Sequence, residues 1–305
     1  MRFGGHETFA IREGWLHKGL SLLIEQPDRL VDTYAADWLG VGRNMAKSIR
    51  HWLVATGLAT QATASRSGRQ VHLETTELGH LIHERDPYFS ESGTWWTMHI
   101  NLVHAPAHAA SWLWFFNSFN LNRFERAVCI EGLHRHLQLT ERRLPTLKTL
   151  HRDVACLLHT YARPIPPEHV DPEEARECPL TELGLLSYFR TTGHYQLHQG
   201  AKDIPPHVFG YALATAFPDT GTDANMVDVT LHDAIRHAGG PGKVFVLTSE
   251  ALFDVALRVE SDVPRGDIQI AGLASERVIR VRKKPPLEWL RDYYAHIEQR
   301  DRDAA

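Results

Sequence analysis

The residues with the clearest catalytic potential lie near the start of the chain. His6 and Glu7 follow a pair of glycines, and Arg12 comes shortly after them. A histidine beside a carboxylate can act as a general base, and an arginine can hold a phosphate group. The same residues also fit a capped, salt-bridged helix start that docks the N-terminus on the core, and the residue types alone favour this plainer interpretation. A catalytic role for His6, Glu7 and Arg12 is therefore a hypothesis.

Two other runs resemble motifs but lack what the chemistry requires. Residues 239–244 resemble the end of a phosphate-binding P-loop, but Val244 stands where Ser or Thr would bind magnesium. A glycine turn before a strand is the better interpretation. Residues 151–153 read His-Arg-Asp, but side chains two positions apart do not share a helix face. Neither run is assigned a catalytic role.

A helix predicted at residues 43–56 combines an apolar side with a cationic side. Met45, Ile49, Trp52 and Leu53 fall on one side and should pack inward. We expect the polar side of this helix and two arginines of the hairpin that follows it to bind DNA. These residues are Arg43, Asn44, Lys47, Ser48, Arg50 and His51 on the helix and Arg66 and Arg69 on the hairpin. A helix of this kind can enter the major groove of a duplex and reach base edges and phosphates. The alternatives are solvated charges on an ordinary surface helix, or a module that contacts protein.

The charge around this helix is local. Residues 36–73 contain five Lys or Arg and one acid, Asp37, whereas the whole chain carries a formal net charge of -4. A nucleic-acid site on this chain must therefore be a basic patch on an otherwise acidic body.

The predicted elements of this region follow the order of a winged helix-turn-helix. They are helices at residues 11–23 and 43–56, strands at 58–64 and 70–73, and a helix at 77–84. Gly42 marks the turn before the second helix, and Thr75 or Thr76 can cap the last one. We therefore predict a DNA-binding domain over residues 1–90.

The rest of the chain is divided by a segment rich in Pro and Glu. Dense apolar and aromatic runs predict a helical middle domain at residues 91–162, and residues 163–179 have the composition of a linker. A C-terminal α/β domain is expected over residues 180–305. Its predicted elements are helices near 180–189, 206–217 and 230–237 and a strand at 244–247. The fold class is mainly α with small β hairpins, a winged helix-turn-helix followed by helical domains.

The composition is typical of a globular protein that buries a sizeable core. Of 305 residues, 43% are hydrophobic and 23% are charged. No run approaches the ~20 apolar residues of a membrane helix, and the N-terminus lacks the apolar segment of a signal peptide. Three widely spaced cysteines match neither a disulfide framework nor a CxxC metal site. We expect a reduced, cytoplasmic protein without a membrane partner.

The string FGGHETFAIREGWL at residues 3–16 resembles the opening of an uncharacterised bacterial domain family found in DNA phosphorothioation and defence cassettes. Looser similarity at residues 94–99, 150–154, 187–188 and 239–245 extends the resemblance over most of the chain. The sequence is thus similar to the SspB-like components of Ssp-type phosphorothioation systems. The resemblance implies a subunit that engages double-stranded DNA and nicks one strand, together with a cysteine desulfurase, an ATPase and a sulfurtransferase.

The function therefore has two interpretations of different classes. The first is a DNA-binding subunit of a phosphorothioation system for modification and defence, which nicks one strand. A metal-dependent nickase would need Mg²⁺ or Mn²⁺ and carboxylate ligands, but the sequence shows no obvious carboxylate cluster and no metal ligand is assigned. The second is a non-catalytic winged-helix adaptor or a transcription regulator. No family active site is carried over, because the resemblance supplies no motif with assigned roles.

Overall fold

The structure is a computed structural model that describes residues 3–62, 72–167, 178–218, 225–264, 266–273 and 276–304. The chain divides into two compact units, Met1–Leu197 and His198–Ala305. Within the described residues, helices predominate and the strands form three small sheets. The fold class is therefore mainly α with small β elements, as the sequence predicts.

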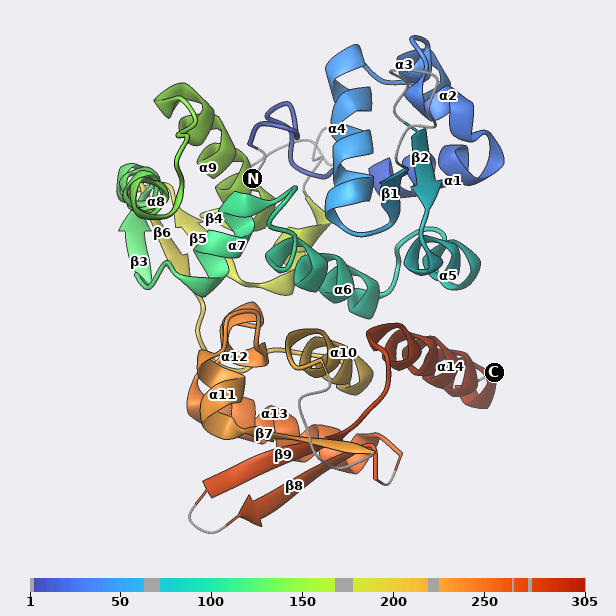
Figure 1. Cartoon of the computed structure of the whole chain (residues 1–305), viewed down its shortest axis with the longest axis vertical. Coiled ribbons are helices and arrows are strands. Elements are labelled where there is room, and N and C mark those ends of the chain that lie inside the picture. Colours follow the sequence, from blue (N-terminus) through green and yellow to red (C-terminus); the bar gives the residue numbers. More distant parts are fainter. Residues whose placement is uncertain are drawn as a thin grey trace. The chain divides into compact units, whose positions relative to one another are not determined.

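The first unit begins with a group of short helices and one strand pair (Figure 1). Its elements are α1 (Trp15–Glu25), α2 (Pro27–Val31), α3 (Ala35–Leu39), α4 (Arg43–Ala55), β1 (Ala59–Ala62), β2 (His72–Thr75) and α5 (Glu77–Arg85). The strands β1 and β2 pair antiparallel, with Ala59 opposite Thr75. The helices predicted at residues 43–56 and 77–84 are confirmed as α4 and α5.

Local signals account for the boundaries of these two helices. Gly40 adopts the left-handed conformation, with φ 65°, and ends α3. Gly42 then provides the extended residue before α4. Thr76 caps α5, because its hydroxyl accepts the backbone N–H of Gly79 at 3.1 Å. The expected cap at residue 75 or 76 is thus Thr76.

The remainder of the first unit is a helical layer packed on a small sheet. The helices are α6 (Ser92–Val103), α7 (Ala110–Asn117), α8 (Arg126–Thr140), α9 (Leu147–Tyr161) and the 3-10 helix η1 (Pro179–Leu183). The strands are β3 (Arg123–Glu125), β4 (Ala162–Ile165), β5 (Leu186–Phe189) and β6 (His194–Leu197), in the spatial order β3-β6-β5-β4. The β4–β5 pair is parallel and the other two pairs are antiparallel.

Because of this sheet, the boundary between the two units lies after Leu197 rather than near residue 180 as expected. Residues 180–197, which the sequence assigns to the C-terminal domain, belong to the first unit because β5 and β6 pair with β4 and β3. The helix expected at residues 180–189 is instead η1 followed by β5, since Gly184, with φ 63°, stops the helical turn. Of the expected linker, residues 163–165 lie in β4, and residues 168–177 lie outside the described residues.

The second unit contains a three-stranded antiparallel sheet, in the order β7-β9-β8, and five helices among its described residues. The elements are α10 (Pro206–Ala216), β7 (Met226–Thr230), α11 (Leu231–Arg236), α12 (Pro241–Val244), α13 (Ser249–Asp262), β8 (Ile268–Leu273), β9 (Glu276–Arg282) and α14 (Pro286–Ala304). Trp289 of α14 is fully buried and lies so close to Gly210 of α10 that a Cβ there would be 2.3 Å from the indole. The strand predicted at residues 244–247 is wrong, because α12 and a turn occupy this run.

None of the helices in the described part of the chain is both long enough and apolar enough to span a lipid bilayer.

Candidate nucleic-acid interface

The N-terminal motif is anchored by a buried polar network around Asp153 of α9. The Nε2 atom of His6 lies 3.1 Å from Oδ1 of Asp153, and the backbone N–H of Gly4 donates to the same oxygen at 2.6 Å. The hydroxyl of Ser111 donates to Oδ2 at 3.0 Å. The side chains of His6, Ser111 and Asp153 are all buried. Each oxygen of the carboxylate therefore has a partner inside the protein.

The hydrogen bonds of His6 define its role in this network. Its Nδ1 accepts the backbone N–H of Thr8 at 3.0 Å, so the ring proton is on Nε2 and is donated to Asp153. Both ring nitrogens are thus engaged. Although Ser111, His6 and Asp153 are the residue types of a hydrolase triad, the hydroxyl of Ser111 donates to the aspartate rather than to the histidine. In this arrangement the histidine does not activate the serine.

The three proposed catalytic side chains point to different surroundings. His6 packs between Trp52 and Trp112, with ring centroids 6.1 and 6.0 Å away. Glu7 faces Lys47 of α4, with 3.8 Å between Oε1 and Nζ. The guanidinium of Arg12 lies over the Phe9 and Trp15 rings, about 5 Å from each. The structure does not bring the three together.

The N-terminal segment runs between α4 and α9 (Figure 1), and it holds α4 in place. The indole N–H of Trp52 donates to the carbonyl of Phe9 at 3.0 Å, and Ile49 and Leu53 are fully buried beside it. The predicted inward side of the helix at residues 43–56 is therefore confirmed at Ile49, Trp52 and Leu53. Met45, predicted to pack inward with them, is only partly buried and lines a surface hollow.

Fewer of the polar side chains of α4 are exposed than the sequence suggests. Arg43, Asn44 and Lys47 are exposed, and the hydrogen bonds among their side chains are limited to one of 3.4 Å from Lys47 to Asn44. Arg50 is half-buried, and this loss of solvent lowers the pKa of its guanidinium.

Two of the residues expected to bind DNA are buried. Ser48 is fully buried, with its hydroxyl 3.5 Å from the carbonyl of Phe9. His51 is also buried and lies against Gly5, where a Cβ would be 2.5 Å from its Nδ1. Both side chains therefore support the N-terminal segment. Arg66 and Arg69, at the expected hairpin tip, lie outside the described residues.

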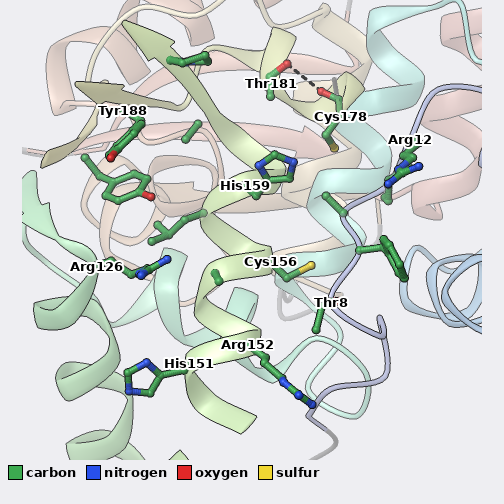
Figure 2. A pocket seen from close by; sticks show the side chains of 18 of the residues that line it. Thr8, Arg12, Arg126, His151, Arg152, Cys156, His159, Cys178, Thr181 and Tyr188 are labelled. Atoms are coloured by element: carbon green, nitrogen blue, oxygen red, sulfur yellow. Dashed lines mark hydrogen bonds between the residues drawn. The ribbon is translucent and has the colours of Figure 1, made fainter. Parts of the chain in front are cut away.

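A large open cavity lies between the N-terminal segment, α8, α9 and the β4–β5–β6 face of the sheet. Its volume is about 950 Å³. Figure 2 shows Thr8 and Arg12 on one side of α9 and Arg126 and Tyr188 on the other, with His159 between them. The basic side chains that line it are Arg12, Arg126, Lys148, His151, Arg152, His159 and Arg190. Among the described residues, the lining includes no Asp or Glu.

One wall of the cavity depends on the His6 network. Glu7 and Thr8 adopt positive φ angles of 50° and 74°, which non-glycine residues rarely occupy. The bond from the Thr8 backbone to His6 compensates for this strain, and Thr8 is the first residue of the segment that lines the cavity. The buried network therefore positions residues 8–12 against α9.

A family model described as "Protein of unknown function (DUF4007)" matches residues 3–294 of this chain. The chain belongs to this family. No curated protein matches it. Among solved structures, the chain is similar to one described as "Magnesium ion-bound SspB crystal structure", with a TM-score of 0.84, and to another described as "SspB crystal structure", with a TM-score of 0.80. Each is 24% identical, and each comparison covers 96% of this chain and 88% of that chain.

The likeness to SspB extends over nearly the whole chain, and it establishes a shared fold. It confirms the resemblance that the opening string indicated, because the matched region includes both units. The α4 surface and the cavity therefore belong to a DUF4007 protein with the SspB fold.

The cysteines near the cavity are poorly suited to sulfur transfer. Burial raises the pKa of the Cys178 thiol to about 12, and burial, with the charge of Asp153 beside it, raises the pKa of Cys156. A thiol that stays protonated is a weak nucleophile. Both cysteines line the cavity as apolar groups.

The expected divalent metal would need a cluster of ligating side chains. Within the described part of the chain, no group of three or more His, Cys, Asp or Glu side chains is placed to hold a metal ion. Among the described residues, the expected Mg²⁺ or Mn²⁺ therefore has no ligand set made by the protein alone.

Proposed function

We propose that this protein binds double-stranded DNA through the exposed edge of α4, as the DNA-binding subunit of a bacterial DNA phosphorothioation system. The observation that carries the proposal is the pair Arg43 and Lys47. They lie one helical turn apart, both are exposed, and the opposite side of α4 is fixed in the core. Side chains presented in this way can reach phosphates or base edges without rearrangement of the helix.

The elements around α4 support a winged-helix interpretation. The α3–α4 turn precedes the proposed recognition helix, and the antiparallel pair β1–β2 follows it, which is the order of a winged helix-turn-helix. Arg12 adds a cation beside this turn, where it lines a small hollow with Gly40, Gly42 and Met45. Asp37 also lines this hollow, and its negative charge repels phosphate. We expect the positive charge of Arg12 to offset that repulsion.

The assignment to phosphorothioation is supported by the fold that this chain shares with SspB. On this proposal the partners are duplex DNA, an ATPase and a sulfurtransferase. The sulfur chemistry belongs to those partners, since the cavity cysteines are buried and protonated.

The DNA-binding proposal is tested by reversing charge on α4. Duplex affinity should be measured by fluorescence anisotropy over a range of salt concentrations for the wild type, Arg43→Glu with Lys47→Glu, and the control Arg142→Glu. Arg142 is exposed and lies outside α4 and the cavity. The α4 variant should bind far more weakly, and its salt slope should fall by roughly 0.9 for each phosphate that the protein no longer neutralises. Unchanged duplex affinity in the α4 variant refutes the proposal.

Strand nicking remains a prediction from the resemblance, with His6, Glu7 and Arg12 as its proposed residues. It is tested by incubating supercoiled plasmid with the protein and Mg²⁺ or Mn²⁺. Relaxed circles that disappear with chelator and in Glu7→Ala support a nickase that uses the N-terminal motif. Relaxation that persists in both His6→Ala and Glu7→Ala removes that site assignment. Tight duplex binding without relaxation favours the non-catalytic adaptor.

A further inference from the structure

The cavity beside α9 has an unusual charge for a concave site. Five Lys or Arg side chains line it, and no carboxylate among the described residues does so. Arg126, Lys148 and Arg152 are exposed and form no ion pair within the described part of the chain. Cations gathered in a hollow repel one another, and an anionic ligand relieves that repulsion.

The cations approach the hollow from separate elements. Arg126 is the first residue of α8, Lys148 and Arg152 lie on α9, and Arg12 lies on the N-terminal segment. Figure 2 shows Arg12 and Arg126 on opposite sides of the α9 residue His159. A ligand that contacts all of these cations must therefore carry negative charge at more than one point. A small anion would contact only some of them.

The sheet provides a second kind of contact. Phe124, Tyr195 and Tyr188 occupy paired positions on β3, β6 and β5 and form a continuous aromatic row, with ring centroids 5.8 and 4.7 Å apart. Both tyrosines line the cavity. Burial and the neighbouring Tyr188 raise the pKa of Tyr195, so its hydroxyl stays protonated and can donate to an anion.

Size narrows the choice of ligand. A volume of about 950 Å³ is in the upper part of the range of small-molecule sites, so the cavity has room for more than a bare phosphate ion. A combination of cations and aromatic rings is the chemistry that binds nucleotides of single strands, because phosphates meet the cations and bases stack on the rings.

We propose that this cavity binds a phosphate-bearing nucleotide, either free or at the 5′ end of a DNA strand. The site is separate from the α4 surface, although Arg12 borders both. In the DNA-bound protein it would take a single-stranded 5′ end while α4 contacts the adjoining duplex. The nucleotide site itself does not require α4 to bind DNA.

The test uses the full chain and a short oligothymidine with a 5′ phosphate and a 3′ fluorescent label. Binding is measured by anisotropy for the wild type, for Arg126→Glu with Arg152→Glu, and for the control Arg142→Glu. We expect the affinity of the cavity variant to fall by about tenfold or more, because each substitution removes a charge-assisted hydrogen bond to the ligand. The control should bind like the wild type. If Arg126→Glu with Arg152→Glu fails to fold, the milder pair Arg126→Gln with Arg152→Gln replaces it.

Competition distinguishes the two sources of the phosphate. Displacement of the probe by thymidine 5′-monophosphate at concentrations where inorganic phosphate has no effect supports a site for free nucleotides. Displacement only by a 5′-phosphorylated strand supports a strand-end site. A probe that binds the cavity variant as tightly as the wild type, or that fails to bind the wild type, overturns the proposal.

The two proposals fail in different ways. Arg43→Glu with Lys47→Glu should retain binding of the single-stranded probe, and the cavity variant should retain affinity for a blunt duplex without phosphates at its ends. Loss of duplex binding in the α4 variant together with unchanged probe binding in the cavity variant would sustain the proposed function and refute the nucleotide site.

Discussion

Two neighbouring residues on α9 have opposite environments. Asp153 is buried and accepts hydrogen bonds from Gly4, His6 and Ser111, whereas Arg152 is exposed at the cavity and has no ion pair within the described residues. A polar group whose partners are all internal stabilises the fold. A charged group without an internal partner is available to a ligand. His6, part of the motif most suggestive of catalysis, is thus held inside the protein by Asp153, whereas Arg152 faces the cavity in which we propose that a ligand binds.

The largest effect should come from removing the carboxylate at the centre of the network. Asp153→Ala leaves three donors without their acceptor, two of them on the buried side chains of His6 and Ser111, so we expect the free energy of unfolding to fall by about 4 kcal/mol. Urea unfolding monitored by tryptophan fluorescence measures this change. Ser111→Ala, which removes one donor, should cost only about 1 kcal/mol. Equal stability of Asp153→Ala and the wild type would show that the network does not anchor the N-terminus.

The next effect concerns the thiols of the cavity wall. Burial raises the pKa of Cys178 to about 12, so alkylation of this thiol in the native protein at mildly alkaline pH should be at least about a hundredfold slower than in the urea-unfolded chain. Mass spectrometry after timed iodoacetamide treatment gives the rate. Fast native labelling at Cys178 would mean that the cavity wall opens to solvent and that its apolar role is misassigned.

A much smaller effect on stability is expected one residue away from Asp153. Arg152→Glu should change the free energy of unfolding by no more than about 0.5 kcal/mol, because the side chain is exposed and unpaired within the described residues. The same urea experiment measures it, with Arg142→Glu as the matched surface control. A loss as large as that of Asp153→Ala would remove the distinction between the two sides of α9.

A similarly small effect should be a gain in duplex affinity. Glu7 lies 3.8 Å from Lys47 and competes with phosphate for this cation. Glu7→Gln removes the competing charge, and because exposed ion pairs are weak we expect duplex binding to strengthen by only about two- to fourfold. Anisotropy titrations at low and high salt measure the gain, which should shrink as salt screens the pair. Weaker duplex binding of Glu7→Gln would place Glu7 in direct contact with DNA.

Patterns within a few residues determined the local structure of this protein. The α4 helix and its inward side follow from apolar spacing, and Thr76 caps α5 because a Thr hydroxyl can accept an N–H three residues ahead. Such signals depend on neighbours in the chain, so they can be read without knowing the fold. The opening string was also sufficient to indicate the family.

Only the tertiary structure decided what the polar residues do. His6 and Asp153 are 147 positions apart, and no local pattern predicts their contact. Residues 151–153 do not share a helix face. Asp153 therefore lies in the core, whereas His151 and Arg152 line the cavity. The cavity assembles side chains from the N-terminal segment, two α-helices, the 3-10 helix η1 and three strands. Its charge is visible only when these segments lie together, because the cations are dispersed in a chain whose net charge is -4.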